Sequence, residues 1–222
     1  MYSVVNVFGT IQGEGAHAGT PAIFVRLGGC NMWSGVEQHR ERDAARNGAE
    51  CPRWCDTDFR PRMQLTAEQI ADEVRKHGDR PLIVITGGEP LLQVDNDLII
   101  ALTDFRPESK RRIQIETNGT VAPKFTRWSR VWITLSPKLP RDETLLTEAD
   151  ELKLVYPAHD PAQWESFPLS SGERFLSPQN TPPNPHSPEW RRGDHEAQAV
   201  AYVQANPQWR LSLQTHKIIG VP

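Results

Sequence analysis

Short apolar segments alternate with segments of helical periodicity along this chain. The clearest apolar segment is 81–86, Pro-Leu-Ile-Val-Ile-Thr, which is typical of a strand buried on both faces of a parallel sheet. A capping box formed by Thr66 and Gln69 predicts a helix that ends near Gly78. The other expected strands are 4–8, 22–27, 112–116, 131–135, 151–155, 174–176 and 209–214, and the other expected helices are 92–105 and 194–205. Strands that alternate with helices predict an α/β fold built on a parallel sheet.

Polar motifs directly follow four of these strands. They are Cys30, Gly87-Gly88-Glu89, Glu116-Thr117-Asn118 and Ser136-Pro137-Lys138. Because the carboxyl ends of parallel strands meet at one edge of a sheet, we expect these motifs to form a functional site there.

Composition and charge exclude several classes of protein. The 222 residues carry a net charge of −3, which gives no attraction to nucleic acid. No apolar run approaches the roughly 20 residues of a membrane span, and the first residues lack the basic and apolar segments of a signal peptide. We therefore expect a cytoplasmic protein with no nucleic-acid or membrane partner. We expect one domain over 1–222, with a polar insert at about 31–50 and a proline-rich loop at about 177–193.

The chain contains three cysteines, and all of them lie between positions 30 and 55. Three thiolates on one stretch can hold a zinc ion, with His39 as the fourth ligand, or a [4Fe–4S] cluster with one iron left open. For a cysteine group of this kind a structural zinc site is the commoner outcome, and three unrelated buried thiols are a third possibility. The spacing alone leaves these alternatives open.

Two further features have both a functional and a structural interpretation. Gly87 and Gly88 let the backbone approach a ligand, and Glu89 can accept from an ammonium group, but a strand-to-helix turn also needs glycine. Arg26 alternates with the core residues of its strand. It therefore points either into a pocket or to a salt bridge on the surface.

Nine short blocks of the sequence belong together: FGTIQGEG at 8–15, GxP at 19–21, FVRL at 24–27, GCN at 29–31, CDTD at 55–58, TGGEP at 86–90, ETNG at 116–119, SPK at 136–138 and LQTHK at 213–217. Taken together, these blocks resemble the 7-carboxy-7-deazaguanine synthases, a family of radical S-adenosylmethionine (SAM) enzymes in queuosine and 7-deazapurine biosynthesis. The usual cysteine motif of radical SAM enzymes is C-x3-C-x2-C, whereas the gaps here are twenty and three residues.

The resemblance implies a fold and a reaction. The fold is an incomplete parallel (β/α) barrel of the radical SAM type. The reaction is that of a carbon–nitrogen lyase, which contracts the ring of 6-carboxy-5,6,7,8-tetrahydropterin to 7-carboxy-7-deazaguanine and releases ammonia. The implied cofactors are a [4Fe–4S] cluster, SAM and Mg²⁺. The implied partners are the pterin, an external one-electron reductant of the flavodoxin or ferredoxin type, and a second copy of the chain in a homodimer.

The resemblance also assigns roles to individual residues. The cluster ligands, which are the catalytic residues, are Cys30, Cys51 and Cys55, and the magnesium ligand is Thr57. The SAM-binding residues are Trp54, Gly88, Glu89, Ser136, Lys138, Ser177, Gln179 and Asn180. The substrate-binding residues are Gln12, Gly13, Glu14, Arg26, Thr86, His216 and Pro222, the last through a terminal carboxylate.

Two other functions compete with this one. A glycyl-radical activase shares the GGEP block and the three cysteines, but it lacks the FGTIQGEG and LQTHK blocks. A zinc module without enzymatic activity would use the cysteines as a structural clip.

Overall fold

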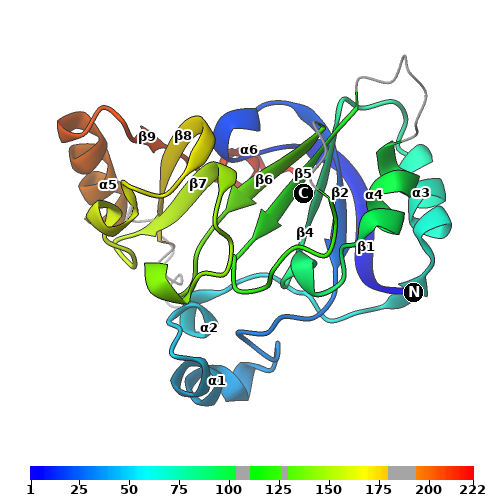
Figure 1. Ribbon diagram of the computed structural model, residues 1–222, viewed down its shortest axis with the longest axis horizontal. Coiled ribbons are helices and arrows are strands. Elements are labelled where there is room, and N and C mark those ends of the chain that lie inside the picture. Colours follow the sequence, from blue (N-terminus) through cyan, green and yellow to red (C-terminus); the bar gives the residue numbers. More distant parts are fainter. Residues whose placement is uncertain (104–110, 127–129, 180–193) are drawn as a thin grey trace.

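The structure, a computed structural model, describes residues 1–103, 111–126, 130–179 and 194–222. Within them, strands form one sheet in the order β3-β1-β2-β4-β5-β6-β7-β8-β9 (Figure 1). The strands are β1 (Tyr2–Ile11), β2 (Pro21–Leu27), β3 (Met63–Leu65), β4 (Leu82–Gly87), β5 (Arg112–Thr117), β6 (Val131–Leu135), β7 (Ala149–Tyr156), β8 (Leu169–Pro178) and β9 (Arg210–Leu211). The helices are α1 (Arg40–Asn47), α2 (Cys51–Trp54), α3 (Ala67–Arg75), α4 (Asn96–Thr103), α5 (Asp194–Ala205) and α6 (Thr215–Ile219).

The strands do not all run in one direction. Every neighbouring pair from β2 to β9 is parallel, which confirms the expected parallel sheet for this part of the chain. The expectation was wrong for β1, which pairs antiparallel with β2 and with β3. The connection 12–20 is too short for the crossover of about a dozen residues or more that a parallel pair requires. The result is an open, mixed α/β sheet, as expected for an incomplete barrel.

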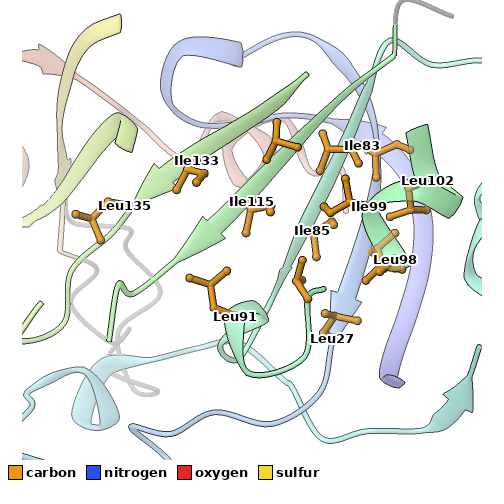
Figure 2. Packing of buried hydrophobic residues seen from close by; sticks show 14 of the residues in the cluster. Leu27, Ile83, Ile85, Leu91, Leu98, Ile99, Leu102, Ile115, Ile133 and Leu135 are labelled. Carbon is orange, nitrogen blue, oxygen red and sulfur yellow. The ribbon is translucent and has the colours of Figure 1, made fainter. Parts of the chain in front are cut away.

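One face of the sheet is apolar and lies against α3 and α4 (Figure 1). Figure 2 shows Ile83 and Ile85 of β4 packed beside Leu98 and Ile99 of α4, and all four side chains belong to the main buried cluster. Full burial of one such side chain contributes about 1.5–3 kcal/mol. This layer is therefore the main source of the stability of the fold.

The opposite face carries polar side chains at the same level of successive strands. Arg26 of β2 lies beside Thr86 of β4, and Glu116 of β5 lies beside Thr134 of β6, which in turn lies beside Glu151 of β7. The Thr86 hydroxyl donates to Glu116 Oε2 over 3.1 Å and closes the row between β4 and β5. Because neighbouring strands are about 4.8 Å apart, Arg26 and Glu116 are separated by about 10 Å across the row.

Several element boundaries differ from the prediction. The capping box is confirmed, because Thr66 Oγ1 accepts from the backbone N–H of Gln69 over 3.2 Å and Gln69 Oε1 accepts from that of Thr66 over 2.8 Å. The helix expected over 92–105 begins only at Asn96, since Leu92 ends the 3-10 turn Pro90–Leu92, and its last expected residues lie outside the described ones. The strand expected over 209–214 is limited to β9, because the chain then turns into α6, which the sequence pattern did not predict.

The expected polar insert and proline-rich loop are both partly structured. The insert contains α1, which packs back onto its own base: Asn47 Nδ2 donates to Met32 O over 2.7 Å, and Asp43 Oδ2 accepts from the Ser34 N–H over 2.9 Å. Of the segment 177–193, Ser177 and the following proline are the last residues of β8, and 180–193 lie outside the described residues.

Candidate active site

The three cysteines lie together at the carboxyl end of β2. Cys30 follows β2 directly, Cys51 begins α2, and Cys55 follows its last residue. Cys51 packs in a small apolar cluster with Met32 and Leu139, and Cys30 and Trp54 pack against the same cluster. The structure therefore brings together two segments of chain that the insert separates in the sequence.

The surroundings of the thiols suit ligands of a bound group rather than free thiolates. Burial raises the pKa of Cys51 to about 12; nearby Lys138 opposes this rise, and the other two thiols add to it. Burial also raises the pKa of Cys30, although backbone N–H groups of Met32 and Trp33 donate to its sulfur. Thiols placed in this way become thiolates when positive iron binds them, and Lys138 supplies a compensating charge.

In the described part of the chain, no three His, Cys, Asp or Glu side chains form a preformed site for a metal ion. This holds for a zinc site with His39 and for a cluster alike, so the positions of the thiols alone favour neither.

The glycines of the GGEP block have a structural role as well as an expected functional one. A Cβ at Gly88 would lie 2.0 Å from Gly29 O, and one at Gly87, whose φ is 138°, would lie 2.0 Å from Leu27 O. The end of β4 therefore needs glycine so that it can cross the end of β2 beside Cys30.

Glu89 is 1% exposed and joins the ends of β4 and β5. Its carboxylate accepts from the Leu91 N–H over 2.8 Å, from Thr117 Oγ1 over 2.7 Å and from the Asn118 N–H over 2.7 Å. Burial raises its pKa, and these three donors oppose the rise. A carboxylate has about four acceptor positions, so one remains for an ammonium group of a ligand.

Of the other expected SAM-binding residues, Ser136 and Lys138 follow β6, Ser177 and Gln179 lie at the end of β8, and Trp54 ends α2. The ammonium of Lys138 donates to Ser136 O over 2.9 Å and to Ser136 Oγ over 2.8 Å, and it lies 5.6 Å from the centre of the Trp54 ring. Trp54 Nε1 is buried and has no acceptor among the described residues. Ser177 and Gln179 end β8 and follow it, farther along the sheet, and Asn180 lies outside the described residues.

The expected substrate residues line one pocket of about 300 Å³ on the polar face of the sheet. All of them contribute to its wall except Gly13, and the expected magnesium ligand Thr57 contributes as well. The wall consists of Phe8, Ile11, Gln12, Glu14, Phe24, Arg26, Asp56, Thr57, Thr86, Glu116, Gln214, His216, Lys217 and Pro222.

Arg26 presents a guanidinium to this pocket without a carboxylate partner. Its Nε is buried and has no acceptor, and it forms no salt bridge within the described residues. Its carbon Cζ lies 5.6 Å from the centre of the Phe8 ring. The structure therefore favours the pocket over the surface salt bridge that the sequence also allowed.

Opposite Arg26, a buried lysine joins two carboxylates. Lys153 Nζ lies 2.5 Å from Glu14 Oε2 and 3.5 Å from Glu116 Oε1. Gln214 Nε2 donates to Glu14 Oε1 over 2.8 Å, and Gln12 Nε2 donates to Glu116 Oε1 over 3.3 Å. Burial alone would raise the pKa of Glu14, but the Lys153 charge and the hydrogen bonds from Lys153 and Gln214 lower it to about 2, so it stays ionised.

The segment from Gln214 to Pro222 forms one side of the pocket. Gly13 O accepts from Thr215 Oγ1 over 2.8 Å, and a Cβ at Gly13 would lie 2.1 Å from His216 Nδ1. Burial lowers the pKa of His216. Gly13 therefore supports α6 and is not part of the pocket wall. At the end of the segment, Pro222 O accepts from Thr10 Oγ1 over 2.8 Å.

Thr57 lies between two cavities. Besides the substrate pocket, it lines a cavity of about 500 Å³ on the side of the insert, together with Cys55 and Trp33. The preceding residue, Asp56, is joined to Lys217 of α6 over 2.5 Å. The CDTD block therefore connects the cysteine cluster with the substrate pocket.

Sequence reasoning gave no binding role to Lys153, Gln214, Asp56 or Lys217, and it placed Glu116 at the functional edge of the sheet without a role in the pocket. For Glu116 and Lys153 a signal was present, because the strands Arg-Ile-Gln-Ile-Glu-Thr and Glu-Leu-Lys-Leu-Val alternate apolar and polar residues. In a sheet with one apolar face, alternation of this kind places the polar residues on the other face.

Comparison with known proteins supports the same arrangement. The Radical SAM superfamily matches residues 47–165. The chain is 41% identical to a 7-carboxy-7-deazaguanine synthase from Bradyrhizobium diazoefficiens, over 99% of both chains, and 41% identical to one from Bordetella pertussis, over 100% of this chain and 99% of the relative. It shares its fold with the crystal structure of QueE from Escherichia coli, with a TM-score of 0.63 and 24% identity over 96% of this chain and 93% of that one.

Across the described ranges, none of the helices has the length and apolar character needed to cross a membrane.

Proposed function

Because this chain belongs to the family of 7-carboxy-7-deazaguanine synthases within the radical SAM superfamily, we propose that it converts 6-carboxy-5,6,7,8-tetrahydropterin to 7-carboxy-7-deazaguanine and releases ammonia. The observation that carries this proposal is the polarity of the substrate pocket. The Arg26 guanidinium, whose Nε has no acceptor among the described residues, lines the same pocket as the carboxylates of Glu14 and Glu116. A carboxypterin has the matching polarity, with a carboxylate at one end and N–H donors at the other.

The cysteine site fits a [4Fe–4S] cluster with Cys30, Cys51 and Cys55 as ligands. The support is the donor set, three neighbouring thiols with a buried lysine close to them. When bound, the cluster and SAM supply a carbon radical that removes a hydrogen atom from the substrate. An external one-electron reductant of the flavodoxin or ferredoxin type is part of this proposal.

Residues at the strand ends would bind SAM. We assign the SAM ammonium group to the remaining acceptor position of Glu89, since that carboxylate is already fixed by three internal donors. We assign Lys138 and Ser136 to the carboxylate or ribose of SAM, and the ring of Trp54 to its adenine, because its buried Nε1 still needs an acceptor. Gly88, Ser177, Gln179 and Asn180 would complete the SAM-binding site.

The pocket residues would hold the pterin still during ring contraction. Arg26 would bind the substrate carboxylate through two parallel N–H···O bonds. Glu14 and Gln12 would bind the amino-pyrimidine edge, and Thr86, His216 and the Pro222 carboxylate would contact the ring. Phe8 and Phe24, whose rings stack with 5.4 Å between their centres, add an apolar wall that excludes water.

Thr57 would be the protein ligand of a magnesium ion. Its place in the wall of the substrate pocket supports this proposal. Mg²⁺ keeps several waters and takes few protein ligands, so one hydroxyl from the protein is chemically sufficient. The ion would then bridge the protein and the substrate.

The activity is tested by anaerobic reconstitution with iron and sulfide. The protein is then incubated with SAM, the carboxy-tetrahydropterin, Mg²⁺ and dithionite, and the deazapurine product and ammonia are measured. We expect a brown protein that forms product and consumes little SAM. A protein that carries the cluster and cleaves SAM but forms no deazapurine would overturn the proposal and would direct attention to glycyl-radical formation on a partner protein.

We also propose a homodimer in the cytoplasm. The family resemblance supports both statements, and the exposed apolar side chains of Ile218 and Ile219 beside the pocket are compatible with a subunit contact. Size-exclusion chromatography with light scattering tests the dimer directly.

A further inference from the structure

Lys153 is a buried cation to which neither the cluster nor SAM binding gives a role. It lies on β7, on the same face as Glu151, and only 6% of it is exposed. It does not line the substrate pocket itself. Instead, its ammonium contacts two carboxylates that do, Glu14 at 2.5 Å and Glu116 at 3.5 Å.

Lys153 places one positive charge beside both of these carboxylates. They lie on one wall of a half-closed pocket, and Glu151, another buried carboxylate, is close to the same lysine. Burial and neighbouring negative charge both favour the protonated form of a carboxylic acid. A protonated carboxyl can donate one hydrogen bond, and its ability to accept is reduced.

We propose that Lys153 is a positioning residue that fixes the carboxylates of Glu14 and Glu116 as a pair of acceptors, so that the pocket selects rings that carry an amino group next to a ring N–H. This inference rests on the proposed function, since it specifies how the same pocket recognises its substrate.

The donors around the two carboxylates fix their direction. Gln214 holds one oxygen of Glu14, and Lys153 holds the other. Gln12 and Thr86 hold one oxygen each of Glu116. Each carboxylate has about four acceptor positions, so each keeps some for a ligand. Two fixed acceptors match an amino group and the neighbouring ring N–H, whereas a carbonyl in place of the amino group would face a carboxylate.

Two stable ligands distinguish this role from a general structural one. 6-Carboxypterin carries the amino group, and 6-carboxylumazine has a carbonyl at the same position. Equilibrium binding of both is measured on the reconstituted protein in the presence of SAM. We expect the wild-type protein to bind the pterin at least about tenfold more tightly, since a carboxylate opposite a carbonyl is left without its hydrogen bond.

Lys153→Met should weaken pterin binding at least about tenfold and reduce the preference to less than about threefold, while iron content and uncoupled SAM cleavage stay at the wild-type level. Lys153→Arg keeps the charge and should keep most of the preference. Lys76→Met, which removes an exposed ion pair with Glu73 on α3, is the matched control and should change neither affinity.

The proposal is overturned if folded Lys153→Met keeps the full preference for the pterin, or if it loses both ligands equally. If Lys153→Met cannot bind the cluster, Lys153→Arg decides, because a folded arginine variant without the preference contradicts a role for the charge. Wild-type protein that prefers 6-carboxypterin but forms no deazapurine would overturn the proposed function and not this inference. If the wild-type protein forms the deazapurine and Lys153→Met keeps the full preference for the pterin, this inference is overturned and the proposed function is not.

Discussion

At the scale of single residues, the site is built from buried polar groups that are either fully partnered or left open on the pocket side. Glu89 has three donors and Glu14 has two, whereas Arg26 Nε has no acceptor among the described residues. A buried donor without a partner costs about 1–3 kcal/mol. A ligand carboxylate at Arg26 would remove this cost, which supports the proposed role of the guanidinium at one end of the substrate.

Arg26→Ala should raise the KM for the pterin by about ten- to a hundredfold, which corresponds to the loss of a charge-assisted hydrogen bond of about 1.5–3 kcal/mol. The KM of Arg26→Lys should lie between that of the wild type and that of Arg26→Ala, because an ammonium cannot form the bidentate pair. The measurement is steady-state turnover over a range of pterin concentrations, with uncoupled SAM cleavage as the control that must persist. An unchanged KM in Arg26→Ala would remove Arg26 from the substrate site.

Glu151 gives the protein a pH-dependent stability. Burial raises its pKa from 4.5 to about 7, although Lys153 and the N–H groups of Ala16 and Trp132 oppose the rise. Between these two values the folded protein holds a proton that the unfolded chain has released. The contribution of Glu151 is therefore fully present below pH 4.5 and is lost as the pH rises toward 7.

Glu151→Gln should remove this loss, because the amide keeps an oxygen for both donors and has no charge to bury. The variant should match the wild type near pH 5 and exceed its stability above pH 7 by up to about 3 kcal/mol. Urea denaturation between pH 5 and pH 8 checks this. If the free energies of unfolding of the wild type and of Glu151→Gln change in parallel over that range, Glu151 is ionised throughout.

At the scale of the elements, the position of α6 closes the substrate pocket. α6 is held by the Gly13 carbonyl at its start, by the ion pair of Lys217 with Asp56 and by the bond from Thr10 to Pro222. These contacts come from β1, from the loop after β1 and from the cluster segment. The pocket wall is therefore complete only when the segment from Gln214 to Pro222 is in place.

Gly13→Ala should displace α6, because the added Cβ would lie 2.1 Å from His216 Nδ1. We expect the KM for the pterin to rise about ten- to a hundredfold, since small displacements of positioning groups have effects of this size, while iron content stays the same. Gly78→Ala is the matched control. Its φ of 81° makes alanine strained, but no atom lies within 4 Å of the new Cβ, so only stability should decrease. Equal KM values for Gly13→Ala and the wild type would show that α6 does not depend on this contact.

The elements that local signals specify were predictable, and those that depend on distant contacts were not. The capping box at Thr66 and the apolar strand at 82–87 are local patterns, and both were found. α6 is a short helix whose place depends on Gly13, about 200 residues away along the chain, and nothing local predicts it. The pair of Lys153 and Glu14 joins residues 139 apart, so alternation could place each on the polar face without showing that they meet.

At the scale of the whole molecule, the sheet separates stability from chemistry. α3 and α4 cover one face near β1, β2, β4 and β5 with aliphatic side chains (Figures 1 and 2). The row from Arg26 to Glu151 occupies the other face. The cysteine cluster, the SAM-binding residues and the pocket lie at the carboxyl ends or on the polar face. The polar face can stay only partly filled because the apolar face supplies most of the hydrophobic burial.

Leu98→Ala tests this separation, since Leu98 of α4 is fully buried on the apolar face. Removing a buried leucine leaves a cavity and typically costs about 2–5 kcal/mol, so the urea midpoint of the variant should fall strongly. At a temperature where both proteins remain folded, the KM for the pterin and the iron content should equal those of the wild type. Leu145→Ala is the control, because Leu145 is 60% exposed and its removal should change stability by no more than about 0.5 kcal/mol. A folded Leu98→Ala protein with a changed KM would show that packing on the apolar face reaches the pocket through the strands, and that the two faces are not independent.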